Sequence, residues 1–415
     1  MNRRLPGCTL IGVLPLFLLI AGCNQSPPPA AAAPVEPAST VSVDPNDFLP
    51  IWRNSLPLDK GDSISRVYVM QDLVLAVSEN NVVYVINKSD GVVRFINYVD
   101  GGGRAIGKPL VLADRIIYPA QTTLQVYNRR TGDFIRSVDL GFTISSGIVS
   151  EDDQLYMGAD LGGGELANVD LSRTYVPVRW KLLVFGEVSG APALYDNIIY
   201  VGSGDGGVRA VTPDRTAMWP LEHDAFFTGG PIVGDIQVDD AGVYAASASG
   251  RLVCLDRNTG QIAPSIDPRT DKLNTGGWQY FAPNPLRTGP VVTPTMVYQQ
   301  VPDVGMVAID KVKLIPVDPD GRHRISEINR TPQWISPDAA QFVSENRRFT
   351  FVGSADQELL ALDKGNGAIR YRSDGTHFAA MASNLTDSLI YASAADGTIV
   401  ALRPVLQPGS PGYIQ

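Results

Sequence analysis

A short strand-turn-strand segment returns eight times along this chain. Its clearest copy is LVCLDRNTGQI, residues 252–262, in which an apolar run ends at a turn that contains Asp256 and Gly260. The Asp side chain accepts hydrogen bonds from nearby backbone amides and the glycine adopts a positive φ, so the segment predicts a β-hairpin. Related segments lie at residues 84–95, 125–136, 166–180, 208–219, 306–317, 359–372 and 398–405.

An apolar strand that ends in an aromatic or small residue precedes each hairpin. The residues aligned with Tyr200 run from Leu75 in the first unit to Tyr391 in the eighth, so the mean spacing is about 45 residues. One four-stranded propeller blade uses this length, whereas leucine-rich, TPR and ankyrin repeats have shorter periods and mostly helical units. The sequence therefore predicts an all-β fold, an eight-bladed β-propeller whose blades are four-stranded and antiparallel.

The eighth unit lacks an outer strand, because Arg403-Pro404 and a Gly- and Pro-rich ending follow its last apolar run. Residues 48–58, FLPIWRNSLPL, form a strand left over before the first unit, with Trp52 in the place that Trp219 holds in a complete unit. An unpaired edge strand invites association with another chain. We therefore predict that this N-terminal strand pairs into the last blade and closes the ring.

Charge and rare residues argue against several classes of site. A net charge of −9 argues against a nucleic-acid partner. His223, His323 and His377 lie in different repeats without metal-ligand spacing, so we expect no metal site. Cys254 takes the slot that alanines occupy in other repeats, which predicts a buried packing residue with no disulfide partner.

The N-terminus resembles a bacterial lipoprotein signal peptide. Arg3 and Arg4 precede an apolar run, and the run ends in a lipobox, Leu19-Ile20-Ala21-Gly22, directly before Cys23. The resemblance implies cleavage before Cys23, a diacylglycerol on its thiol and an acyl chain such as palmitate on its amino group. Several acyl chains anchor a protein stably to a membrane. The alternative is an uncleaved signal anchor, for which the apolar run is short.

The residues after Cys23 predict where the protein is held. Asn24 replaces the Asp that marks inner-membrane retention in enterobacterial lipoproteins, so the resemblance implies the periplasmic face of the outer membrane. We expect a signal peptide over residues 1–22, a lipidated Cys and Pro/Ala-rich tether over 23–47, the propeller over 48–405 and a tail over 406–415.

The repeat itself resembles that of the pyrroloquinoline quinone (PQQ)-type β-propellers. The shared pattern, a strand followed by Asp-x-x-Thr/Asn-Gly, covers roughly residues 60–405, although units three, six and eight have degenerate turns. Together with the lipobox and tether, it resembles the BamB-like group of outer-membrane assembly lipoproteins. That resemblance implies a monomeric, non-catalytic scaffold that binds a protein partner in the cell envelope.

Two other functions are compatible with the repeat. PQQ-dependent dehydrogenases resemble this chain, but their site needs a pair of adjacent cysteines, a Trp platform and a calcium site, and the sequence has no adjacent cysteines. We therefore expect no PQQ cofactor and no enzyme activity. A lipoprotein that binds a small ligand or glycan in the central funnel is the other alternative.

The longest spacings between units place extra chain at residues 265–288 and 318–337. The first segment carries Trp278, Tyr280, Phe281 and Arg287, and aromatic residues with Arg are typical of protein-binding hot spots. These four are the candidate partner-binding residues. Two arrangements are open: the aromatic cluster is offered to a partner, or Trp278 is the outer-strand aromatic of unit five. A blade edge that pairs with an extended peptide is a further candidate.

Overall fold

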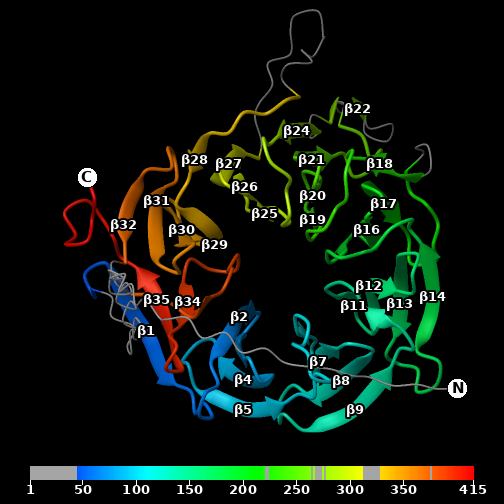
Figure 1. The fold of residues 1–415 in the computed structure, drawn as a ribbon, viewed down its shortest axis with the longest axis horizontal. Helices are drawn as coiled ribbons and strands as arrows, with labels where there is room; N and C mark the ends of the chain where they lie inside the picture. The colour runs from blue at the N-terminus through cyan, green and yellow to red at the C-terminus, as the bar shows by residue number, and fades with distance from the viewer. Residues whose placement is uncertain are drawn as a thin grey trace, which may run out of the picture. The chain divides into compact units, whose positions relative to one another are not determined.

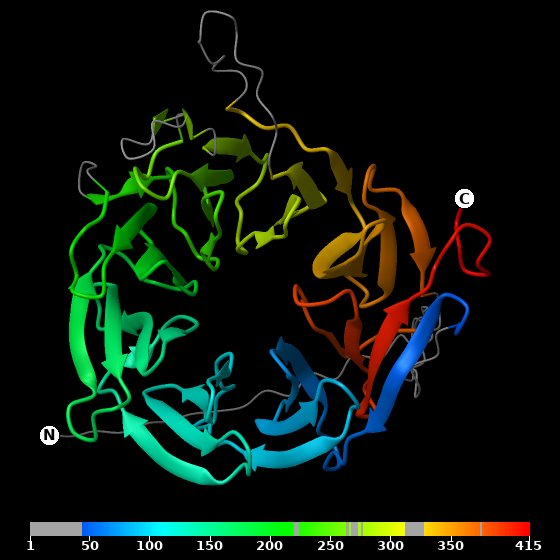
Figure 2. The same cartoon turned by 180° about the vertical axis from the view of Figure 1, so that it is seen from behind.

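The computed structural model describes residues 44–219, 224–262, 265–266, 273–274, 277–311, 328–373 and 376–415. Their regular structure is β-strand, arranged as eight sheets around a central axis with one further two-stranded hairpin (Figures 1 and 2). The predicted eight-bladed propeller is confirmed. No helix in this part of the chain is long and apolar enough to cross a membrane.

Each blade contains an inner, a second, a third and an outer strand. Blade one contains β2 (Ile64–Met70), β3 (Leu73–Ser78), β4 (Val82–Asn87) and β5 (Val93–Tyr98). Blade two contains β6 (Leu110–Val111), β7 (Arg115–Ala120), β8 (Thr123–Asn128) and β9 (Phe134–Asp139). Blade three contains β10 (Thr143–Ile144), β11 (Val149–Glu151), β12 (Gln154–Asp160), β13 (Glu165–Asp170) and β14 (Val178–Leu183); β10 and β11 share the inner position. Blade four contains β15 (Ala193–Tyr195), β16 (Ile198–Gly202), β17 (Gly207–Val211) and β18 (Phe226–Phe227).

The second half of the ring follows the same order. Blade five contains β19 (Gln237–Val238), β20 (Val243–Ala246), β21 (Arg251–Leu255) and β24 (Trp278–Phe281). A separate hairpin, β22 (Ser265–Ile266) and β23 (Leu273–Asn274), interrupts this blade in sequence. Blade six contains β25 (Val291–Val292), β26 (Met296–Val301), β27 (Gly305–Asp310) and β28 (Trp334–Ser336). Blade seven contains β29 (Ala339–Glu345), β30 (Phe349–Ser354), β31 (Leu359–Asp363) and β32 (Ile369–Arg372). Blade eight contains β33 (Ala380–Met381), β34 (Ile390–Ser393), β35 (Thr398–Pro404) and β1 (Phe48–Ser55).

The predicted ring closure is also confirmed. Strand β1 pairs antiparallel with β35 and places Trp52 opposite Ala401, so the N-terminal strand is the outer strand of the last blade. The end of the chain then packs on this closure: Gly412 N donates to Asp47 Oδ2 at 3.0 Å and Ile414 N donates to Arg370 O at 2.7 Å. The two ends of the described ring therefore hold each other in place.

The core is divided among the blade interfaces, because every sheet buries both faces. In β4, Tyr84 and Ile86 pack toward blade eight, whereas Val83 and Val85 pack toward blade two. The described residues form eight such hydrophobic clusters, one between each pair of neighbouring blades. This two-sided burial explains the continuous apolar runs in the sequence. Cys254 is fully buried in one of these clusters, as predicted, and burial raises the pKa of its thiol.

Four tryptophans each join one blade to the next one. The Trp219 indole Nε1 donates to Arg257 O at 2.8 Å, and a Cβ at Gly260 would lie 2.4 Å from the Trp219 ring. Only glycine suits this turn position, because the backbone has a positive φ of 68° and the Trp219 ring leaves no room for a Cβ. Three further indoles make the same bond: Trp52 to Lys88 O, Trp180 to Pro213 O and Trp334 to Lys364 O.

Candidate protein-binding surface

The two faces of the ring carry different turns and different side-chain contacts. One face of the ring carries the turns that follow the inner and the third strands, and we call it the bottom face. On this face, ion pairs between neighbouring blades tie the turns together: Arg115 to Asp153 at 3.1 Å, Arg257 to Asp196 at 3.0 Å, Lys311 to Asp239 at 2.5 Å and Lys88 to Asp387 at 2.8 Å. The top face carries the turns after the second strands and the connections that lead to the next blade.

Exposed phenylalanines lie on the top face of blades three to five. The ribbon of these blades is green to yellow-green in Figure 1. Phe185 follows β14, Phe227 ends β18 and Phe281 ends β24. Their exposed fractions are 61%, 42% and 57%. Each residue lies where an outer strand ends, so three neighbouring blades present an aromatic side chain at a similar place.

Two arginines lie beside these rings, Arg209 near Phe185 and Phe227 and Arg251 near Phe281. The guanidinium carbon of Arg209 lies 5.7 Å from the Phe185 ring centroid and 5.9 Å from that of Phe227. The guanidinium carbon of Arg251 lies 5.1 Å from the Phe226 ring and 5.8 Å from that of Phe281. Distances below about 6 Å are typical of cation–π contacts. We call Phe185, Arg209, Phe227, Arg251 and Phe281 the Phe–Arg stripe.

The two arginines of the stripe are held differently. Arg209 pairs with Asp205 through Nη2 at 2.6 Å and through Nη1 at 3.2 Å. Burial alone would raise the pKa of Asp205, but the hydrogen bonds from Arg209 and Ser203 outweigh it and lower that pKa. Arg251 instead donates from Nε and Nη2 to Gln279 Oε1, at 2.8 and 2.6 Å, and makes no ion pair within the described chain. Its charge is therefore not neutralised by a carboxylate, and burial lowers its pKa.

Of the four candidate residues predicted from the sequence, two are buried and two are exposed. Trp278 and Tyr280 are buried, because alternate residues of β24 point toward blade six. Trp278 lies opposite Cys254, its ring 6.2 Å from that of Tyr244, so it occupies the outer-strand aromatic position. Phe281 and Arg287 are exposed. As surface residues, only the latter two fit the idea of a partner-binding segment.

Several sequence predictions lie outside the described residues. These are the signal peptide, the lipobox and Cys23, together with His223, His323 and parts of the two extra segments. His377 is described, and its Nδ1 lies 2.7 Å from Asp356 O. No group of three His, Cys, Asp or Glu side chains that could hold a metal occurs in the described part.

Sequence reasoning missed Arg209, Arg251, Phe185 and Phe227. Arg209 lies in GVRAV and Arg251 begins RLVCL, so each is a cation in an otherwise apolar strand. That pattern is the one available signal, since a charge in a buried strand needs a partner. The stacking with rings from a neighbouring blade depends on the spacing of the blades and has no local pattern.

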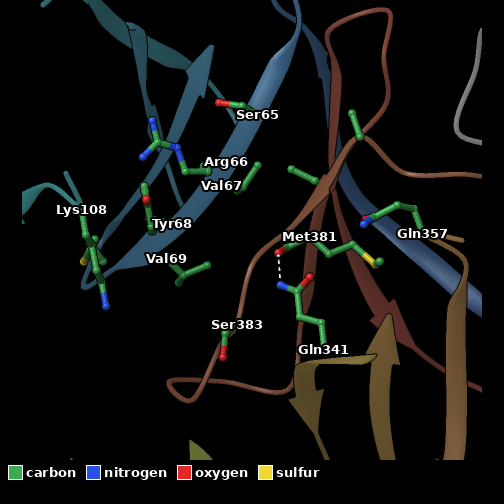
Figure 3. Close-up of a pocket in the computed structure, with 13 residues that line it drawn as sticks. Ser65, Arg66, Val67, Tyr68, Val69, Lys108, Gln341, Gln357, Met381 and Ser383 are labelled. Atoms are coloured by element: carbon green, nitrogen blue, oxygen red, sulfur yellow. Dashed lines mark hydrogen bonds between the residues drawn. The ribbon is translucent and has the colours of Figure 1, made fainter. Parts of the chain in front are cut away.

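A second feature of the ring is a hollow along its axis. The larger part encloses about 750 Å³ and is lined by the inner strands of blades two to five. A smaller part of about 380 Å³ lies between blades one, seven and eight (Figure 3). Both are lined by Met70 and Lys108, so we treat them as one axial cavity. Neither Trp nor Cys is among its described lining residues.

Comparisons with known proteins agree on the fold. The family model described as outer membrane protein assembly factor BamB matches residues 120–263, which include the residues of the stripe other than Phe281. The solved structure of BamB from Moraxella catarrhalis is similar, with a TM-score of 0.60 and 17% identity over 86% of this chain and 97% of that chain. A search of curated protein sequences finds no match.

Other propellers are similar to the same degree. The quinohemoprotein alcohol dehydrogenase ADHIIG from Pseudomonas putida HK5 gives a TM-score of 0.59 and 13% identity over 89% of this chain and 78% of that chain. The computationally designed Ika8 protein gives 0.58 and 15% over 85% and 98%. At such identities the likeness concerns the fold alone, and the chain is a PQQ-like, BamB-like β-propeller.

Proposed function

We propose that this protein is a non-catalytic scaffold of the cell envelope that binds a protein partner through the Phe–Arg stripe. The observation that carries the proposal is two adjacent sets of cation–π contacts, one around Arg209 and one around Arg251, with Phe185 and Phe281 exposed. Aromatic residues and arginines dominate binding hot spots because they bury large areas while retaining hydrogen-bonding capacity. The blades fix the spacing of the stripe, so little conformational entropy is lost on binding.

The match to the BamB family model supports an envelope partner, with outer-membrane protein assembly as the process. Lipidation at Cys23, in the lipobox of residues 19–23, would place the ring at the periplasmic face of the outer membrane. The Pro/Ala-rich residues between Cys23 and β1 would hold it away from the lipid. A single lipidated chain with a preformed binding surface needs no second copy, so we propose a monomer.

The test is affinity purification of the full-length protein from its own envelope in mild detergent, followed by mass spectrometry. The variant is Phe281→Glu, which puts a carboxylate into the stripe. The matched control is Phe134→Glu on β9, because Phe134 is 56% exposed but lies on the outer strand of blade two. Deleting residues 265–288 would be a poor test, since it removes β24 from blade five.

We expect an outer-membrane assembly protein to copurify with the wild type and with Phe134→Glu, and to be recovered at least tenfold less with Phe281→Glu. A tenfold loss corresponds to about 1.4 kcal/mol, which is modest for a hot-spot residue. Equal recovery with both variants would contradict the role of the stripe. If no defined partner copurifies with the wild type, the scaffold proposal itself fails.

A further inference from the structure

The axial cavity has walls that suit an amphiphilic molecule. Its larger part is lined by apolar side chains of the inner strands, among them Leu110, Ile144, Leu194 and Val238, interspersed with polar residues such as Thr143, Ser145 and Gln237. Where the two parts of the cavity meet, the lining changes to polar and charged groups. Figure 3 shows Arg66, Tyr68 and Lys108 on one side and Gln341, Gln357 and Ser383 on the other.

The charge of the lining is opposite to that of the protein. Arg66, Arg104 and Lys108 line the cavity, whereas Asp235 is the one described acidic residue there. The whole chain carries a net charge of −9. A concave site with low-dielectric walls concentrates the field of the charges that line it, so this cavity attracts anions although the protein as a whole repels them.

Most polar groups of the wall are already used by the protein. Asp235 Oδ1 accepts a 2.8 Å hydrogen bond from Ala191 N, and Gln341 Nε2 donates to Met381 O at 2.8 Å. Arg66 Nη1 donates to Ile106 O at 2.7 Å, which fixes its guanidinium at the rim. These groups shape the cavity and leave little capacity for a ligand.

Lys108 and Arg104 differ from these hydrogen-bonded groups of the cavity wall. Both are exposed, and neither side chain makes a hydrogen bond or ion pair with another residue of the described chain. Lys108 borders both parts of the cavity and Arg104 borders the larger one. Two unpaired cations therefore border a cavity whose other described walls include both apolar and polar side chains.

We infer that the axial cavity binds a small organic anion with an apolar body. Its acidic group lies at Lys108 and Arg104, and its apolar part lies along Leu110, Ile144 and Leu194. Pockets that bind small molecules combine apolar walls with a few placed polar groups, and their volumes range from about 300 to 1,000 Å³; both parts of this cavity fall within that range. This site is separate from the Phe–Arg stripe and does not rest on the scaffold function.

The probe is 8-anilinonaphthalene-1-sulfonate, an organic anion with an apolar body whose fluorescence rises in an apolar site. The protein should begin at residue 37, because detergent would bind the dye and such a protein keeps all eight blades and β1. The test variant is Lys108→Glu. The matched control is Lys60→Glu, since Lys60 is exposed, makes no described contact and does not line the cavity.

We expect saturable binding of one dye per chain, at least tenfold weaker for Lys108→Glu and within twofold of wild type for Lys60→Glu. The neutral dye N-phenyl-1-naphthylamine should respond equally to both variants. Phe281→Glu should leave dye binding unchanged, which separates the cavity from the stripe. Lys108→Gln should lie between wild type and Lys108→Glu, which guards against a folding defect in the latter.

Two results would overturn the inference. One is fluorescence that rises without saturation at one dye per chain. The other is an equal loss of affinity in Lys108→Glu and Lys60→Glu, which would mean that the dye senses net charge and not the cavity.

Discussion

The indole Nε1 of Trp52 donates a 2.9 Å hydrogen bond to the backbone oxygen of Lys88, which ties the strand that closes the ring to blade one. The Lys88 ammonium in turn pairs with Asp387 of blade eight at 2.8 Å. The Trp52 ring also packs on Gly91 of blade one and lies 6.0 Å from the ring of Tyr391 in blade eight. Contacts at one turn therefore join the strand that closes the ring to blade one.

The packing of Trp52 on Gly91 predicts a large effect of a small substitution. Gly91→Ala adds a Cβ that would lie 2.5 Å from the Trp52 ring, at a φ of 74°. Gly61→Ala is the matched control, because its φ is 85° and nothing lies within 4 Å of the added Cβ. We expect Gly61→Ala to lower the free energy of unfolding by about 1 kcal/mol and Gly91→Ala by about 3 kcal/mol. Urea unfolding at pH 7 measures both.

Equal losses in the two alanine variants would mean that backbone strain alone is being measured. The role of Trp52 would then be tested by Trp52→Phe, which retains a ring but removes the indole donor. We expect that variant to lose about 1 kcal/mol, because Lys88 O is left without its hydrogen bond.

Burial of Asp47 predicts a pH dependence at the same closure. Burial raises the pKa of Asp47, an effect that the hydrogen bond from Gly412 N only partly offsets. A carboxyl group whose folded pKa is above its unfolded value stabilises the fold below the unfolded pKa, and that contribution is lost as pH rises through the folded pKa. Asp47→Asn should therefore gain stability relative to wild type between about pH 4 and pH 7.

The measurement is the free energy of unfolding of wild type and Asp47→Asn at several pH values in that range. Other carboxylates, such as Asp205 and Asp387, have lowered pKa values and make stability depend on pH in the opposite direction. Their contribution is the same in wild type and variant, so it cancels in the difference. A difference that stays constant with pH would show that Asp47 has the same pKa in both states.

The fold was predictable from sequence because its signals are local. Turn chemistry at Asp256 and Gly260, continuous apolar strands and a regular spacing each indicate the blade, and the leftover strand with Trp52 indicates the closure. None of these depends on knowing which blades are neighbours. The broken inner strand of blade three and the short β18 have no such signal, because they reflect pairing geometry and not residue type.

The candidate surface was predictable only in part. Phe281 and Arg287 were selected because they lie in extra chain, but Trp278 and Tyr280 were selected for the same reason and are buried. Exposure along β24 depends on its register with β21, since a shift of one residue exchanges the two faces of a strand. A sequence does not give that register.

The membrane anchoring that we propose rests on the lipobox and predicts a simple fractionation result. Cys23→Ser removes the thiol that the diacylglycerol would modify, so the protein should move from the membrane fraction to the soluble fraction of the envelope. Cys8→Ser is the matched control, because LPGC at residues 5–8 imitates a lipobox without a preceding apolar run. Immunoblotting of separated fractions measures the result, and retention of Cys23→Ser on membranes would contradict lipidation at this residue.

The pairing of Arg209 with Asp205 predicts a stability effect that Arg251 does not share. Arg209→Met leaves a largely buried carboxylate without its cation, since the Arg209 and Asp205 side chains are 6% and 19% exposed. We expect a loss of about 3 kcal/mol at pH 7. Arg251→Met removes a guanidinium bound to Gln279, a neutral partner, and should cost about 1 kcal/mol.

The two variants should also differ in their response to acid. Because the folded pKa of Asp205 is lowered, its contribution to stability is present above the unfolded pKa and is lost as pH falls through the folded pKa. The deficit of Arg209→Met relative to wild type should therefore shrink toward pH 3, whereas that of Arg251→Met should not change. Urea unfolding at pH 7 and pH 3 distinguishes these outcomes. Deficits of the same size and the same pH response would mean that both arginines act only through their stacking on the phenylalanine rings, and that the ion pair adds no stability to the surface.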